Sequence, residues 1–282
     1  MAETQLQQIS DHVWWMSPGK PDRPSLCAIA GTHYTLMLDA GASAAHAHLF
    51  LERLRAAGVD GPRYVALSHW HWDHIFGAAE LAVPVIAHKQ TAERLAVLAG
   101  YNWHDAALDQ RVATGEEIPS CAADIKVELP EPREVQIIAP DMVFEHTLTL
   151  HPGGVSCRIQ HVGGDHAADS CVMHILPDRV LFLGDCLYDA IYTPVRHYTR
   201  QRLFPLIDTL LTFDADQYIE GHGDTVMSRA EFIDLTDKMR RAATLIDQHG
   251  PNEEAIRAQV GQPLDEDTEY FVHTLIAGQP FE

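Results

Sequence analysis

The chain has little positive charge, few cysteines and no long apolar run. Its 282 residues carry 20 Lys and Arg against 40 Asp and Glu, which gives a net charge of −20. A surface this acidic repels phosphate backbones and anionic membranes. The densest basic stretches, 196–202 and 238–241, are short. We therefore expect neither nucleic acid nor a membrane among its partners.

The cysteines argue against a disulfide framework. There are five, an odd number, at irregular spacings and without a CxxC pair, which is typical of a reducing compartment. No apolar run approaches 18 residues, and the N-terminus lacks a basic stretch followed by an apolar one. We therefore expect no membrane span, no signal peptide and a cytoplasmic location.

Apolar strand patterns alternate with helical ones, which predicts a single α/β domain over 1–282. Residues 100–135 are rich in loop signals and are expected to form an insertion, and 226–282 a helical C-terminal extension. Strands are expected within 26–38 and at 64–67, 83–87, 143–150, 155–162, 170–176, 180–183 and 217–220. Helices are expected from Ser43 to about Ala57, from Thr91 towards Ala99, from Thr199 or nearer Pro205, from Ser228 to about Gln248, and twice after Asn252.

Residues 68–74 read SHWHWDH, and further histidines and an aspartate follow later strands. Residues two apart in an extended loop point the same way, so the first two histidines can reach one ion and the aspartate and third histidine a neighbouring one. Distant histidines can complete each ion, and a carboxylate can bridge the two ions. Mixed nitrogen and oxygen donors suit zinc, and also iron or manganese. The candidate ligands are His69, His71, Asp73, His74, His166, Asp185 and His222.

This ordered set resembles the signature of the metallo-β-lactamase superfamily over about residues 10–225. The resemblance implies a four-layer αββα sandwich with two metal ions at one edge of its two sheets. It implies that the first ion is held by His69, His71 and His166. It also implies that Asp73, His74 and His222 hold the second ion, with Asp185 bridging both.

A two-metal site of this kind predicts hydrolysis, in which a hydroxide held between two zinc ions attacks a carbonyl. Asp73 is expected to orient the nucleophile and to pass its proton to the leaving group. Asp185-x-x-Tyr188 resembles the D-x-x-Y of the bacterial quorum-quenching lactonases, which favours a lactone and gives Tyr188 a catalytic role at the substrate carbonyl. Packing in a loop is the alternative for this tyrosine.

Other functions stay open at this point. A thioesterase similar to glyoxalase II, a β-lactamase, and an oxidoreductase with one iron similar to the persulfide dioxygenases are the alternatives. A scaffold with a vestigial site is disfavoured because no ligand is missing. The expected partner is a small-molecule substrate, and a homodimer is possible. Trp70 and Trp72 are expected to pack, whereas Tyr101, Trp103 and His104 either pack or form a lid.

Overall fold

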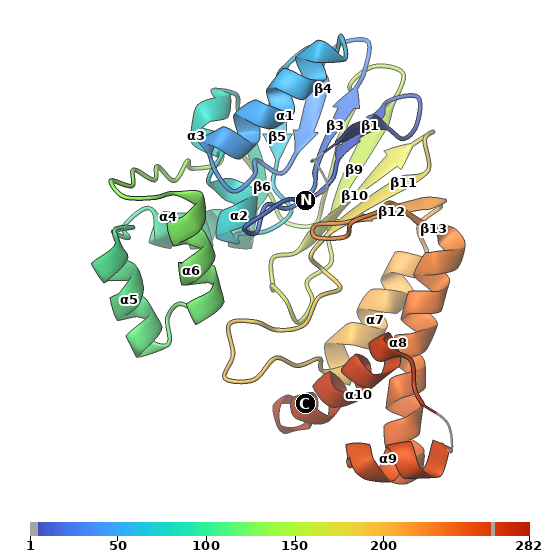
Figure 1. Ribbon diagram of the computed structural model, residues 1–282. Coiled ribbons are helices and arrows are strands. Elements are labelled where there is room, and N and C mark those ends of the chain that lie inside the picture. The colour runs from blue at the N-terminus through green and yellow to red at the C-terminus, as the bar shows by residue number, and fades with distance from the viewer. Residues whose placement is uncertain (1–4, 261–262) are drawn as a thin grey trace.

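The computed structural model describes residues 5–260 and 263–282. Two β-sheets pack face to face, and helices cover their outer faces (Figure 1). The predicted αββα sandwich is therefore confirmed. None of the described helices is both long enough and apolar enough to cross a membrane.

The first sheet, within the described residues, has seven strands in chain order, antiparallel from β1 to β4 and parallel from β4 to β7. Its strands are β1 (Leu6–Gln8), β2 (Val13–Met16), β3 (Leu26–Ala30), β4 (Thr35–Leu38), β5 (Pro62–Ala66), β6 (Val85–His88) and β7 (Met142–Phe144).

The second sheet has the order β13-β12-β11-β10-β9-β8 in the part of the chain described, and only β11 and β12 pair in parallel. Its strands are β8 (Thr147–Leu150), β9 (Ser156–His161), β10 (Cys171–Leu176), β11 (Val180–Gly184), β12 (Gln217–Glu220) and β13 (Met227–Ser228).

Helices follow the strands as crossovers and as two larger groups. Near the first sheet are α1 (Ala44–Ala56), α2 (Trp72–Ile75), α3 (Ala78–Leu81) and α4 (Lys89–Leu98), and the expected insertion contains α5 (Asp105–Thr114) and α6 (Pro119–Glu128). Near the second sheet are α7 (Arg200–Leu211), α8 (Arg229–His249), α9 (Glu253–Val260), α10 (Glu266–Gly278) and the short 3₁₀ helix η1 (Gln279–Phe281).

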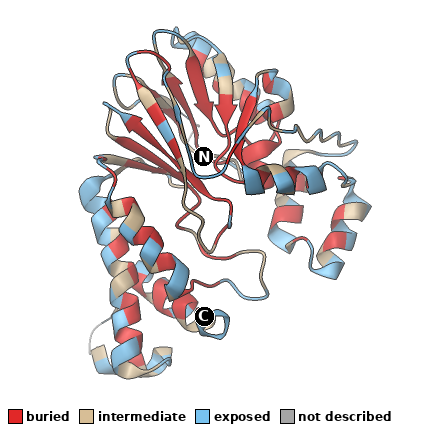
Figure 2. Ribbon diagram, turned by 180° about the vertical axis from the view of Figure 1, so that it is seen from behind, coloured by how far each residue is buried: buried red, intermediate tan, exposed pale blue. Residues whose placement is uncertain are grey.

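Three apolar cores fill the three gaps between the four layers. Strand β3 is apolar on both of its faces. Cys27 and Ile29 enter the core between the sheets. Leu26 and Ala28 alternate with them and enter the core under α1, beside Phe50. Alternate residues of a strand point to opposite faces, so a strand covered on both faces needs a continuous apolar run. Figure 2 shows the resulting buried strands and the half-exposed helices.

Some element boundaries differ from those expected. Helix α4 begins at Lys89 instead of Thr91, because the ring nitrogen of His88 accepts from the Gln90 amide and forms the cap. The stretch expected as one strand over 143–150 is two strands in different sheets, β7 and β8, interrupted at residues 145–146. A chain that changes sheets at this point cannot continue one strand.

Helix α7 begins at Arg200, directly after Thr199, so the earlier of its two expected starts is the observed one and Pro205 lies inside the helix. A proline inside a helix costs about 3 kcal/mol, because one backbone hydrogen bond is lost. Burying each Leu or Ile side chain is worth about 1.5–3 kcal/mol. The buried stripe of this helix consists of Leu203, Leu206, Ile207 and Leu210. Its burial outweighs the cost of the proline.

The five cysteines are all free and buried. Burial raises the pKa of each thiol above its ordinary value, to about 12 for Cys157. Three of them, at positions 27, 157 and 171, belong to the core between the two sheets. They pack as small apolar side chains.

Candidate metal centre

The SHWHWDH stretch follows the carboxyl end of β5 and is only partly extended. His69 lies in the loop, His71 is the cap of α2, and Asp73 and His74 lie within that short helix. The helix was not predicted, because four residues are too few to show a helical period. Trp72 is 3% exposed and belongs to the core under α1, as its expected packing role requires.

The second sheet supplies the remaining candidates from three loops. His166 lies between β9 and β10, Asp185 directly after β11, and His222 two residues after β12. Because β11 and β12 are parallel neighbours, their carboxyl ends bring Asp185 and His222 to the same edge of the sheet. Gly221 permits this approach, since a Cβ there would lie 1.9 Å from Oδ1 of Asp185.

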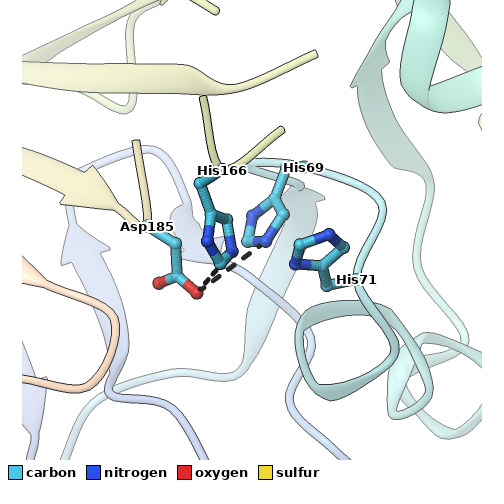
Figure 3. Close-up of side chains that lie close together, drawn as sticks. All are labelled: His69, His71, His166 and Asp185. Carbon is cyan, nitrogen blue, oxygen red and sulfur yellow. Dashed lines mark ion pairs between the residues drawn. The ribbon is translucent and has the colours of Figure 1, made fainter. Parts of the chain in front are cut away.

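The structure brings all seven predicted residues together in two groups that share Asp185. One ligand atom from each member of a group lies within 4.8 Å of the others. Oδ2 of Asp185 is 3.3 Å from Nε2 of both His74 and His166, 3.4 Å from that of His222 and 3.8 Å from that of His69. Figure 3 shows the imidazoles of the first group turned towards one centre. The first group is His69, His71, His166 and Asp185, and the second is Asp73, His74, Asp185 and His222.

The donor atoms of these groups fit metal ions. Buried polar atoms normally have a hydrogen-bond partner, and each one without a partner costs free energy. The buried atoms without a partner include Nε2 of His69, His71, His74 and His166, together with Oδ1 of Asp185, and all five belong to candidate ligands. Imidazole nitrogen and carboxylate oxygen are ligands of zinc and of other transition metals.

In three of these imidazoles the other ring nitrogen, Nδ1, has a protein partner, which leaves Nε2 for the centre. Nδ1 of His74 is 2.7 Å from Asp39, and Nδ1 of His69 is 2.9 Å from the Ser68 hydroxyl. Nδ1 of His166 donates to the backbone oxygen of Asp189 at 3.2 Å. Partners of this kind fix the tautomer and the orientation of a ligating imidazole.

Asp39 is a functional residue that sequence reasoning missed. It is fully buried at the end of β4, and its carboxylate also accepts hydrogen bonds from the backbone and hydroxyl of Ser68. Its φ of 58° lies in the left-handed region, which is uncommon for a residue with a side chain. Its signals in the sequence were the position directly after an apolar strand and the turn Asp39-Ala40-Gly41, which fits the pattern of the superfamily but assigned this aspartate no role.

Burial and neighbouring charge divide the imidazoles into two kinds. Burial, reinforced by nearby imidazoles, lowers the pKa of His69 and His71 well below the ordinary value, so both stay neutral. Burial also opposes the charged form of His222, but Asp185 and Asp73 outweigh it and raise its pKa to about 10. Burial would raise the pKa of both carboxyls, yet His74 and His222 hold it well below the ordinary value. The carboxyls of Asp73 and Asp185 therefore stay ionised, and the raised pKa of His74 and His222 balances their charge.

A cavity of about 340 Å³ opens onto both groups. Tyr188 lines it, and its hydroxyl accepts a hydrogen bond from the His222 amide at 3.2 Å. Burial raises the pKa of this phenol well above its ordinary value, so it keeps its proton. The aromatic residues of the insertion do not line this cavity. Trp103 packs on Phe76 in the core, and His104 caps α5. Of the two roles expected for these residues, packing and a lid, the structure shows packing.

The comparisons with known proteins agree with this geometry. A family model described as the metallo-β-lactamase superfamily matches residues 22–245. The chain belongs to the metallo-β-lactamase superfamily. Among curated proteins, none matches this chain. With its His and Asp cluster, this member of the superfamily is a metal-dependent hydrolase.

Solved structures of this superfamily share the fold with the chain. A metallo-β-lactamase from Pontibacter korlensis is 16% identical, with a TM-score of 0.59 over 83% of this chain and 98% of that one. A metallo-β-lactamase with a HARLDQ motif from Cronobacter sakazakii is 19% identical, with a TM-score of 0.56 over 98% and 93%. The sec-alkylsulfatase Pisa1 from Pseudomonas sp. is 16% identical, with a TM-score of 0.66 over 95% of this chain and 47% of that one. At these identities the likeness establishes the fold alone.

The Asp39→Asn variant of this superfamily member is expected to bind metal about 10–100-fold more weakly, because His74 loses the carboxylate that orients it. The measurement is a competition titration with a chromophoric chelator. Asp60→Asn, which changes an exposed aspartate, is the matched control and should bind metal as the wild type does. Equal affinity in Asp39→Asn and Asp60→Asn would contradict the role assigned to Asp39.

Proposed function

We propose that this chain is a dinuclear zinc hydrolase that cleaves a small carbonyl ester, most readily a lactone. The observation that carries the proposal is Asp185, whose carboxylate belongs to both ligand groups. A carboxylate shared in this way can bridge two ions, and a pair of ions is the arrangement that hydrolytic two-metal sites use. The mixed histidine and aspartate donors favour zinc.

In this proposal Asp73 and Tyr188 have separate catalytic roles beside the metal ions. Bound zinc ions supply an activated water at neutral pH and positive charge for the developing oxyanion. The Asp73 carboxylate, 3.1 Å from Nε2 of both His74 and His222, orients the attacking water and passes its proton to the leaving group. The protonated phenol of Tyr188 donates to the substrate carbonyl oxygen, since its own oxygen already accepts from His222.

The dimensions and charge of the cavity support a small substrate. About 340 Å³ is near the lower end of the range for small-molecule sites. The net charge of −20 disfavours polyanions such as RNA. Ile118 and Ile191 line the cavity and give it an apolar wall for an acyl chain.

The test is metal analysis followed by a substrate panel of lactones, thioesters, β-lactams and secondary alkyl sulfates. We expect about two zinc ions per chain and the fastest turnover with lactones. The Tyr188→Phe variant should keep its zinc and lose about 10²-fold in kcat, because one donor to the oxyanion is removed. The matched control is Tyr64→Phe, since Tyr64 lies in β5 and does not line the cavity.

Other outcomes would replace this proposal. Fastest turnover of thioesters or β-lactams would keep the mechanism and change the substrate. One iron per chain together with oxygen uptake would contradict the zinc hydrolase and assign an oxidoreductase. Unchanged kcat in Tyr188→Phe would return this tyrosine to a packing role.

A further inference from the structure

A network of hydrogen bonds joins the C-terminal helix α10 to the wall of the cavity. Tyr270 of α10 donates to Oδ2 of Asp189 at 2.6 Å. The same carboxylate accepts two hydrogen bonds from Arg196, at 2.9 Å from Nε and 2.7 Å from Nη2. Asp189 is 1% exposed, whereas Arg196 is exposed and lines the cavity. The buried carboxylate of Asp189 therefore connects α10 to Arg196 by hydrogen bonds.

The loop that carries Arg196 contacts α10 and the following 3₁₀ helix η1 at further points. The Tyr198 amide donates to the Thr274 oxygen at 3.2 Å. Gly278 lies so close that a Cβ on it would be 1.8 Å from the Tyr198 oxygen. The ring of Phe281 stacks on His197 at 4.0 Å. Figure 1 shows this loop, between β11 and α7, reaching down from the sheet to the C-terminal helices. Helix α10 therefore fixes the loop's position, although it lies beyond the residues 22–245 that match the family model.

The charged residues around the cavity indicate that Arg196 is its cationic group. The other charged side chains among its described lining residues, besides the candidate ligands, are Asp22 and Asp124. Arg196 is thus the one arginine or lysine in that set. Its bonds to Asp189 use Nε and one Nη2 hydrogen, so Nη1 and the second Nη2 hydrogen stay available. An arginine fixed in this way forms charge-assisted hydrogen bonds with little loss of side-chain freedom.

We propose that α10, acting through Tyr270 and Asp189, holds Arg196 on the cavity wall to bind an oxyanionic group of the substrate, such as a carboxylate. This inference rests on the proposed function, since it names the kind of substrate that the same cavity accepts. Arg196 is the specificity-determining residue, and Tyr270 and Asp189 are positioning residues. A neutral substrate of equal size lacks the contact and binds more weakly.

The experiment measures binding, so that it does not depend on turnover. Chain loaded with two equivalents of zinc is titrated calorimetrically with mercaptocarboxylates of three to five carbons and with their neutral amides. The thiolate binds zinc in both series, so the acid-to-amide ratio of Kd reports the anion contact. We expect wild-type protein to prefer the acid by about tenfold at the best length, as one charge-assisted hydrogen bond permits.

Two variants separate the parts of the network. Arg196→Gln should abolish the preference and leave amide binding unchanged. Tyr270→Phe should reduce the preference severalfold with unchanged zinc content, and the double variant should equal Arg196→Gln. The matched control is Arg257→Gln, because Arg257 pairs with Glu269 on the C-terminal helices and does not line the cavity. It should keep the full preference.

Each contrary result contradicts a defined part of the proposal. A preference that survives Arg196→Gln, or is absent from wild-type protein at every length, overturns the anion contact. A Tyr270→Phe variant that behaves as wild type overturns the role of α10. If no ester is hydrolysed but the preference is present and depends on Arg196, the proposed function fails and this inference stands. A chain that binds no zinc overturns both.

Discussion

The Asp185→Asn variant is expected to lose about 10³-fold in kcat/KM and to bind fewer metal ions than the wild type. Asp185 is the one member common to both ligand groups, and its Oδ2 lies within 3.8 Å of Nε2 of four histidines. A neutral amide offers one oxygen and no negative charge. Metal ions contribute several kcal/mol to transition-state stabilisation, and about 4 kcal/mol corresponds to 10³ in rate.

This prediction is measured by elemental analysis of the purified variant and by hydrolysis of the best substrate in the panel. Asp234→Asn is the matched control, because that aspartate is exposed on α8 and pairs with Lys238. It should retain full activity and metal content. Two ions per chain and wild-type kcat/KM in Asp185→Asn would contradict the bridging role proposed for Asp185.

Removing metal from the wild-type chain is expected to lower its melting temperature by about 10 °C or more. An ion that binds the folded state alone stabilises it by about 4 kcal/mol when its free concentration is a thousand times Kd. In a chain of this size, 1 kcal/mol corresponds to about 2–4 °C. Without ions the centre also keeps several buried nitrogens and one carboxylate oxygen without hydrogen-bond partners.

Calorimetry with a strong chelator, and again after zinc is returned, tests this prediction. The transition should return to its original temperature when metal is restored. Asp39→Asn should show a smaller shift than the wild type, because its ions are bound more weakly at the same free concentration. An unchanged transition in the wild type would contradict a metal-supported fold.

Much of this site could be predicted from the sequence because its residues are local or follow recognisable strands. Three histidines and an aspartate fall within 69–74, and Asp185 directly follows the apolar VLFL run. The GHG around His222 marks a close backbone approach, which the contact between Gly221 and Asp185 explains. The sandwich itself followed from the resemblance that these residues carry.

The remaining features depend on contacts between distant residues. Asp39 is a single carboxylate whose partner His74 lies 35 positions away, so nothing local marks it as part of the centre. Tyr270 and Asp189 are 81 positions apart and meet only because α10 packs beside the loop. Pro205 suggested a later helix start, but the energy that decides it comes from the apolar stripe of α7.

All five cysteines are buried, and among them only Cys121 lines the cavity beside the candidate metal centre. A thiol reacts through its thiolate, and burial suppresses that form at each of these positions. The four cysteines outside the cavity therefore need no replacement before site-specific labelling. One cysteine introduced at an exposed position will carry a fluorophore, a spin label or a surface tether, once Cys121 on the cavity wall is replaced.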